Sequence, residues 1–137
     1  MQTLAPPLVA SLGLMYSVQH PVLVRPSEAA ITAWRALWDG YNNAFYGRYG
    51  ECALPEHVTT TTWQRFFEDD ESIFALVAER GNELIGLAHY LFYRSTTRVE
   101  LFCYLQDLFT AESARGTGIG SRLAMRVASG LCNSLDL

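Results

Sequence analysis

The feature that most constrains the fold is a change of hydrophobic pattern near residue 73. Residues 73–78 form a continuous apolar run of strand length, and residues 84–93 form a second segment rich in aliphatic and aromatic side chains. Between them, Gly81 and Asn82 suit the positive φ angles of a tight turn. The two segments therefore predict a β-hairpin.

A third strand is predicted over residues 99–110, directly after a turn at residues 95–98. Its side chains are mostly apolar on both faces, which is typical of a central strand that is covered on both sides. A glycine-rich stretch, residues 115–120, then leads into a helix that is expected to end at Gly130. One face of this helix carries its apolar residues: Ile119, Leu123 and Val127.

Ahead of the hairpin the sequence predicts a short strand and two helices. The strand, residues 22–25, is closed by Pro26, and Ser27 can cap the first helix with Glu28 in its first turn. Apolar residues at three- and four-residue steps mark one face of that helix: Ile31, Trp34, Trp38, Tyr41 and Phe45. The second helix follows Pro55 and a run of threonines. Its buried side is predicted to be aromatic: Trp63, Phe66 and Phe67.

These elements predict an α+β fold in which helices pack on a mostly antiparallel sheet. With 137 residues, half of them hydrophobic, the chain can form one domain with a buried core. We expect residues 21–137 to be that domain and residues 1–20 to be a loosely ordered apolar leader. The leader lacks the Lys or Arg of a signal peptide and its apolar run is too short to span a bilayer, although a cleaved signal stays an alternative.

Charge and cysteine usage exclude several classes of protein. The net charge is −4 and there is no block of Lys or Arg, so neither a nucleic-acid partner nor a membrane partner is predicted. The chain has three cysteines, Cys52, Cys103 and Cys132. An odd number of widely spaced cysteines favours neither a disulfide framework nor a metal site. Free thiols in a reducing compartment predict a cytoplasmic protein.

The stretch that carries chemistry is Arg115-Gly116-Thr117-Gly118-Ile119-Gly120, where the last helix begins. Backbone N–H groups at a helix start have no helical partners, and together with the helix dipole they form an anion site that suits a pyrophosphate. Glycine lacks the Cβ atom that would keep phosphate oxygens away from this backbone. Arg115 and Arg122 add positive charge.

Two other phosphate-binding loops do not match this stretch. A P-loop requires Gly-Lys-Ser/Thr, and no lysine lies near the glycines. A dinucleotide-binding fingerprint requires GxGxxG after the first strand of a parallel unit, whereas the spacing here is GxGxG after an antiparallel run. An ordinary tight turn before a helix stays open as the purely structural alternative.

Residues 105–110, the glycine stretch and the helix after it together resemble the Gln/Arg-x-x-Gly-x-Gly/Ala signature of the GNAT-superfamily N-acetyltransferases. The resemblance covers residues 22–130. It implies a GNAT-like mixed, mostly antiparallel sheet flanked by helices. It also implies acetyl-CoA as co-substrate, no metal, and direct attack of a primary amine on the thioester. The amine acceptor, a small molecule or a protein, is not specified by the sequence.

The resemblance also assigns site residues. The backbone at the end of the third strand would bind the pantetheine arm and polarise the thioester carbonyl: Leu108, Phe109 and Thr110. The glycine loop and the helix start would bind the coenzyme A pyrophosphate: Arg115, Gly116, Thr117, Gly118, Ile119, Gly120 and Ser121.

A base must take a proton from the acceptor ammonium. Asp107, beside the expected thioester position, is the first candidate, and Glu100 at the start of the third strand is the second. The alternative is that either carboxylate is structural and paired with an arginine. His89 lies in an apolar strand and is expected to be a satisfied core or surface histidine rather than the base.

A cluster of aromatic residues lies where the family builds its substrate entrance: Tyr41, Phe45, Tyr46 and Tyr49. Their rings could hold an amine by cation–π contact, but core packing is the favoured interpretation.

The family continues beyond its third helix with further strands, whereas only residues 131–137 remain here. We therefore expect a domain that is truncated after the third helix, with its C-terminal strands missing. The third strand would then be an exposed apolar edge, open to a homodimer by strand pairing or swapping. A non-catalytic coenzyme A-binding or interaction fragment is the alternative function.

Overall fold

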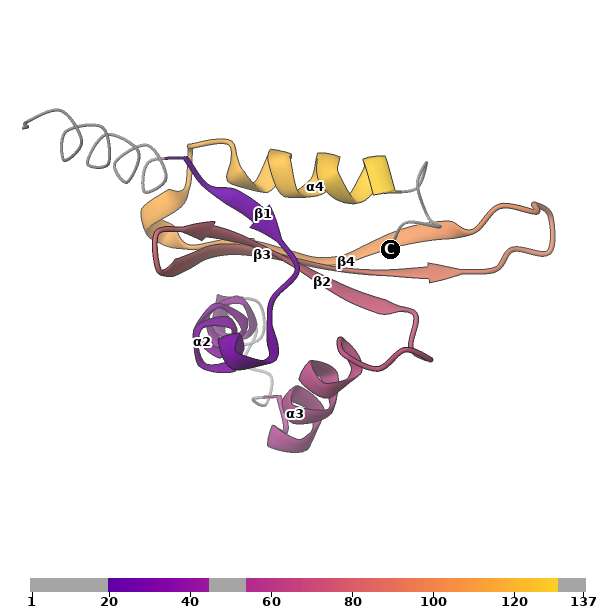
Figure 1. The fold of residues 1–137 in the computed structure, drawn as a ribbon, viewed down its shortest axis with the longest axis horizontal. Coiled ribbons are helices and arrows are strands. Elements are labelled where there is room, and N and C mark those ends of the chain that lie inside the picture. Colours follow the sequence, from indigo (N-terminus) through magenta and orange to yellow (C-terminus); the bar gives the residue numbers. More distant parts are fainter. Residues whose placement is uncertain (1–19, 45–53, 131–137) are drawn as a thin grey trace, which may run out of the picture.

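A computed structural model describes residues 20–44 and 54–130 of the chain. In this part, one antiparallel sheet of strand order β1-β2-β3-β4 lies between two helical layers. Helix α4 covers one face of the sheet, and helices α2 and α3 lie on the other (Figure 1). The predicted α+β fold with a mostly antiparallel sheet is confirmed.

The sheet follows the predicted order along the chain. Its strands are β1 (Val22–Val24), β2 (Ile73–Arg80), β3 (Glu83–Tyr93) and β4 (Phe102–Thr110). The β2–β3 hairpin turns at Gly81, whose φ of 63° is the left-handed conformation that glycine adopts without strain. The predicted hairpin and its turn are therefore confirmed.

Strand β4 differs from the prediction in two ways. It begins at Phe102 rather than at residue 99, and it is the edge strand of the described sheet, paired with β3 alone. The prediction that this strand is central was wrong, whereas both of its faces do contact a helical layer, Leu105 on the side of α4 and Phe109 on the side of α2. Tyr104 is 52% exposed and Leu108 is 37% exposed, so apolar side chains here lie at the surface as well as in the core.

A β-bulge interrupts the pairing of β3 with β4. His89 is opposite Asp107 and Tyr90 is opposite Leu105, which leaves Gln106 as an extra residue on β4. A bulge of this kind changes the direction in which the neighbouring side chains point. It thereby aims Asp107 at His89.

The helices α2 (Ile31–Asn42) and α3 (Glu56–Arg65) form the aromatic layer, preceded by the short 3-10 helix η1 (Glu28–Ala30). The core on this face combines tryptophans with aliphatic residues of the sheet: Trp34, Leu37, Trp38, Trp63, Val77 and Leu87. The threonine run lies inside α3 rather than before it, and Phe66 and Phe67 follow the end of that helix. Trp63 is buried as predicted.

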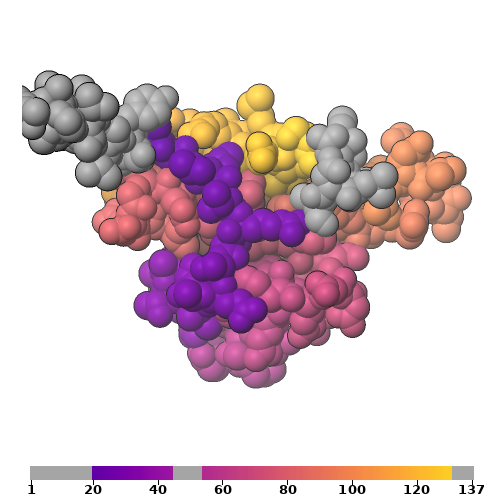
Figure 2. All heavy atoms as spheres, in the orientation of Figure 1, coloured from indigo at the N-terminus to yellow at the C-terminus, as the bar shows by residue number. Residues whose placement is uncertain are grey.

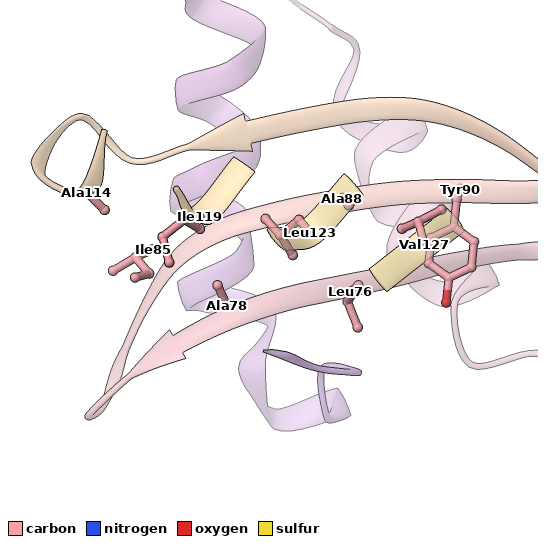
Figure 3. Close-up of a cluster of buried hydrophobic side chains, with 9 residues drawn as sticks. All are labelled: Leu76, Ala78, Ile85, Ala88, Tyr90, Ala114, Ile119, Leu123 and Val127. Atoms are coloured by element: carbon pink, nitrogen blue, oxygen red, sulfur yellow. The ribbon is translucent and has the colours of Figure 1, made fainter. Parts of the chain in front are cut away.

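Helix α4 (Ile119–Gly130) packs on the opposite face through smaller, mostly aliphatic side chains. Figure 3 shows this cluster, whose members are Leu76, Ala78, Ile85, Ala88, Tyr90, Ala114, Ile119, Leu123 and Val127. The predicted apolar face is confirmed, and the helix continues to Gly130, the last residue that the structure describes before 131–137. The approach is close at Gly86, because a Cβ atom there would lie 3.0 Å from side-chain atoms of both Ile119 and Leu123.

The ends of β3 and β4 extend past β2 as a protruding arm, seen as the orange end of the molecule in Figure 2. Within residues 20–44 and 54–130, no helix has the length and apolar character needed to cross a membrane. Several sequence-based expectations concern residues outside the described part: the leader at 1–19, Phe45, Tyr46, Tyr49, Cys52, Cys132 and residues 131–137.

Candidate functional site

The glycine loop is fixed to the sheet at its start. After β4, the Ala111 N–H donates to the Ile85 carbonyl at 2.8 Å, and the short 3-10 helix η3 (Glu112–Ala114) follows. Ala114 is fully buried in the aliphatic cluster. The Thr117 hydroxyl donates to the Ala114 carbonyl and closes the loop on itself. The loop therefore has one defined path between β4 and α4.

Two glycines give the loop its shape. Gly116 and Gly118 have φ angles of 80° and 84°, which side chains rarely adopt. A Cβ atom built at either position would meet no protein atom within 4 Å, so the space over the loop backbone is open. At Gly120, two residues after Gly118, a Cβ atom would lie 3.4 Å from the Thr110 hydroxyl oxygen at the end of β4. The loop thus leaves bare backbone facing outward, as a bound phosphate requires.

The start of α4 adds backbone donors beside this open space. The Arg122 N–H donates to the Gly118 carbonyl at 3.0 Å, which is the first hydrogen bond of the helix. The N–H groups of Ile119, Gly120 and Ser121 precede it and have no helical acceptor. Together with the positive end of the helix dipole, these groups favour an anion.

The two arginines near the loop differ in their contacts. The Arg115 Nε donates to the Thr110 carbonyl at 3.2 Å, and its guanidinium carbon lies 5.5 Å from the centre of the Phe109 ring. Arg122 instead donates to the Pro21 carbonyl at 3.1 Å, beside β1. Arg115 therefore lies between the end of β4 and the glycine loop, and its side chain is exposed. Arg122 ties the first turn of α4 to the segment that leads into β1.

The remaining residues assigned to coenzyme A lie at the same end of the sheet. Leu108 and Thr110 are on the edge strand, and Phe109 packs toward α2, close to Gly40. Ser121 is exposed on the first turn of α4. Ile119 is 2% exposed, so its side chain belongs to the core and only its backbone can face a ligand. The structure thus brings the whole assigned set together around the end of β4 and the start of α4.

The two candidate bases are in different places. Asp107 is on β4, next to the assigned pantetheine strand, and its carboxylate oxygen Oδ2 lies 3.0 Å from His89 Nδ1. Glu100 is exposed in the bend before β4, on the order of 20 Å along the chain from Asp107 at the rise of an extended strand. The structure does not bring Glu100 to the other site residues. The partner of Asp107 is a histidine rather than the arginine of the structural alternative.

His89 is a satisfied core histidine, as expected. It is 1% exposed, and both ring nitrogens have partners, because Nε2 accepts a hydrogen bond from Trp34 Nε1 at 3.0 Å. Sequence reasoning placed Trp34 on a buried face but missed this contact. The sequence indicated this hydrogen bond only in part: a buried indole N–H and a histidine in an apolar strand both need hydrogen-bond partners. The bulge at Gln106 had no sequence signal.

Burial changes the chemistry of two groups near β4. It raises the pKa of the Cys103 thiol above its ordinary value, so the thiol is a weaker nucleophile than a free cysteine at neutral pH. It also raises the pKa of the Tyr90 hydroxyl, and the nearby Arg25 opposes this effect. Both side chains pack with the aliphatic cluster under α4 rather than beside Asp107. No set of three or more His, Cys, Asp or Glu side chains in the described ranges could hold a metal ion.

Comparison with known proteins agrees with this geometry. Residues 34–129 match the sequence model of the Acetyltransferase (GNAT) family. Because the match covers more than half of the chain, the protein belongs to the GNAT family. The resemblance found in the glycine stretch is thereby confirmed.

A relative in Saccharomyces cerevisiae, the D-amino-acid N-acetyltransferase HPA3, is 34% identical over 94 residues, which are 66% of this chain and 55% of HPA3. The chain therefore spans about half the length of that relative.

Solved structures share the fold. AAC(6')-Iy, in complex with the bisubstrate analog CoA-S-monomethyl-acetylneamine, is 16% identical with a TM-score of 0.67, over 84% of this chain and 74% of that one. An acetyltransferase from Vibrio fischeri is 19% identical with a TM-score of 0.63, over 83% and 88%. At such low identity the likeness concerns the fold alone.

Proposed function

We propose that the protein is an N-acetyltransferase that moves the acetyl group of acetyl-CoA to a primary amine. The observation that carries the proposal is the loop at residues 115–120, where two positive-φ glycines leave open space over backbone N–H groups at the start of α4. A pyrophosphate fits such a site by charge and by shape. Membership of the GNAT family supports acetyl transfer as the chemistry.

Each part of the site has a role in this proposal. The N–H groups of residues 116–121 and the guanidinium of Arg115 bind the pyrophosphate. The outer edge of β4 at Leu108–Thr110 has backbone groups that do not pair with β3, and these can bind the extended pantetheine arm as a strand would be bound. A backbone N–H there, aimed at the thioester oxygen, stabilises the charge that develops on it.

Asp107 is the proposed general base. A primary amine is mostly protonated near neutral pH, and the ammonium must lose a proton before its nitrogen can attack the thioester carbon. Asp107 lies on β4 directly before the proposed pantetheine segment, and its side chain is 11% exposed, so one carboxylate oxygen can reach a substrate or a bridging water. The new C–N bond forms and the C–S bond breaks. The attacking nitrogen loses its second proton, which passes to the leaving sulfur, so coenzyme A leaves as the thiol.

The first acceptors to test are amino acids. The S. cerevisiae relative is named for D-amino acids, and AAC(6')-Iy was solved with an acetylneamine conjugate, so free amino acids and amino sugars are the classes that the relatives suggest. The protein's net charge of −4 is compatible with a cationic acceptor.

Calorimetric titration with acetyl-CoA tests the site, and an acetyl-transfer assay on D-amino acids, L-amino acids, polyamines and aminoglycosides tests the reaction. The double variant Arg115→Ala/Gly118→Val should abolish acetyl-CoA binding, because it removes a charge and places a side chain over the phosphate. Ser129→Ala, at the far end of α4, is the matched control. Unchanged affinity in the double variant would place the site elsewhere.

Binding without turnover of any amine would favour the alternative of a non-catalytic coenzyme A-binding or interaction fragment. We also propose a cytoplasmic location, supported by the free thiol of Cys103. We further propose a homodimer formed through the first half of β4, ahead of the pantetheine segment, where its outer edge pairs with no other strand of the described residues. Light scattering at several concentrations tests the dimer, and a monomer at all of them would exclude it.

A further inference from the structure

A chain of hydrogen bonds crosses the core from α2 to β4. Trp34 Nε1 lies 3.0 Å from His89 Nε2, and His89 Nδ1 lies 3.0 Å from Asp107 Oδ2. Trp34 has no exposed surface, and His89 is 1% exposed. The three residues come from three elements that are distant in sequence, and only the end at Asp107 approaches the surface.

The indole of Trp34 determines the protonation state of His89. An indole N–H can donate a hydrogen bond but cannot accept one, so His89 Nε2 must accept with its lone pair. The ring is therefore neutral, and its proton is on Nδ1. That N–H donates to the Asp107 carboxylate. His89 thus has no free lone pair with which to take a proton from a substrate.

Packing holds the imidazole in this orientation. The centre of the His89 ring lies 4.8 Å from that of Phe66, 5.1 Å from that of Trp38 and 5.9 Å from that of Trp34. A ring enclosed on several sides by aromatic groups cannot turn over without moving them. This packing favours the orientation in which the Nδ1–H group points at Asp107.

The two oxygens of the Asp107 carboxylate are in different situations. Its Oδ2 is held by His89, while the side chain keeps 11% of its surface exposed. The bulge at Gln106 turns Asp107 toward His89, so strand geometry and hydrogen bonding act together. The other oxygen, Oδ1, is then the atom that faces outward from the network.

We infer that His89 is a positioning residue for Asp107: its Nδ1–H holds the carboxylate so that the outward oxygen accepts the acceptor's proton, and Trp34 fixes the tautomer that makes this possible. The inference rests on the proposed function, in which Asp107 is the base. It assigns to the aromatic layer a task beyond core packing.

Two substitutions at one position separate this role from packing. The amide nitrogen of His89→Asn can replace Nδ1 and still donate to Asp107, whereas the longer His89→Gln places its amide near the position of Nε2, beside Trp34. We expect His89→Asn to keep most of the turnover. We expect His89→Gln to lower kcat about 100-fold, the loss typical of a reacting group displaced by about 1 Å, with KM for acetyl-CoA unchanged.

The matched controls are His57→Asn and His57→Gln on the exposed surface of α3, neither of which should change kcat. Equal kcat values for His89→Asn and His89→Gln, with acetyl-CoA affinity intact, would overturn the inference. A wild-type protein that binds acetyl-CoA but acetylates nothing would instead overturn the proposed function.

Nitrogen NMR of the wild-type protein tests the network without activity or a variant that must fold. The ring nitrogens of His89 should show a protonated Nδ1 and an unprotonated Nε2 at neutral pH. Trp34→Phe removes the indole donor while keeping an aromatic ring, and it should allow a proton on Nε2. A wild-type ring that is protonated on Nε2 would overturn the inference whatever the assay shows.

Discussion

The two faces of the sheet are built from different residues and carry different parts of the site. The face under α4 is packed mostly with aliphatic side chains, together with the ring of Tyr90 (Figure 3). Side chains of α4 approach the sheet closely at Gly86. The face under α2 and α3 is aromatic, and it encloses polar groups such as His89 and Thr59 that are hydrogen-bonded to indole nitrogens. The first face holds the glycine loop, and the second holds the carboxylate.

The difference shows how one domain can hold both the glycine loop and the Asp107 carboxylate, the proposed anion site and the proposed base, by two kinds of packing. Close aliphatic packing fixes the position of a helix, because any change of volume there is resisted by backbone on both sides. An aromatic layer fixes side chains instead, since indole N–H groups supply both bulk and a directed donor. Disturbing each face should therefore produce a different kind of loss.

The largest effect on stability is expected from Leu123→Ala, in the centre of the aliphatic face. Leu123 has no exposed surface, so the substitution leaves a cavity and should lower the free energy of unfolding by about 2–5 kcal/mol. Urea denaturation measures this. Met125→Ala, on the same helix but 71% exposed, should change stability by no more than about 0.5 kcal/mol. Equal effects of the two substitutions would mean that α4 is not packed as described.

A pair of glycines compares the two faces directly. Gly86→Ala should lower the free energy of unfolding by about 1–3 kcal/mol, because its Cβ would lie 3.0 Å from both Ile119 and Leu123. Gly40→Ala lies within α2, where its Cβ would meet only the half-buried ring of Phe109 at 3.3 Å. Alanine is more favourable than glycine inside a helix by about 1 kcal/mol, so Gly40→Ala should be slightly more stable than wild type. If both substitutions changed the free energy of unfolding in the same direction, the proposed difference between the two faces would be contradicted.

The glycine loop should respond to a side chain through its backbone. Gly118 has a φ of 84°, and Gly118→Ala should lower the free energy of unfolding by about 1–2 kcal/mol, the cost of a left-handed conformation for a residue with Cβ. Thermal denaturation measures this, and acetyl-CoA affinity should fall as well. Ser121→Ala, exposed on the first turn of α4, should leave stability unchanged. A fully stable Gly118→Ala would show that the loop adopts another path.

The smallest effect is expected at the surface link between α2 and α3. Hydrogen bonds from Arg35 lower the pKa of the Glu56 carboxyl below its ordinary value. The stabilisation is therefore present above the pKa that Glu56 has in the unfolded chain, and it is lost as pH falls through the lower pKa of the folded state.

Glu56→Gln should thus be slightly less stable than wild type at pH 7, and this difference should shrink on acidification. Urea denaturation of both proteins between pH 7 and acid pH measures this difference in stability. High salt should reduce the difference, because the ion pair is exposed. A difference that grew toward acid pH would contradict the assigned direction of the shift.

Local pattern was enough to predict the elements and the loop. The hairpin around Gly81, the buried face of α4 and the glycines at 116 and 118 each depend on residues that are neighbours in sequence, where period and turn chemistry act directly. Helix and strand ends were less well predicted, as at β4, since the start of a strand depends on which partner residues are within reach.

The sequence by itself determined the fold class and the glycine loop, because these follow from spacings along the chain, and the resemblance of that stretch to the GNAT signature indicated the family. Only the tertiary structure decided the surroundings of Asp107. The bulge at Gln106, the pairing of Asp107 with His89 and the donation from Trp34 join residues up to 73 positions apart. No local pattern encodes such contacts. They form only when α2 packs on the sheet and buries polar groups, which must then be hydrogen-bonded to one another.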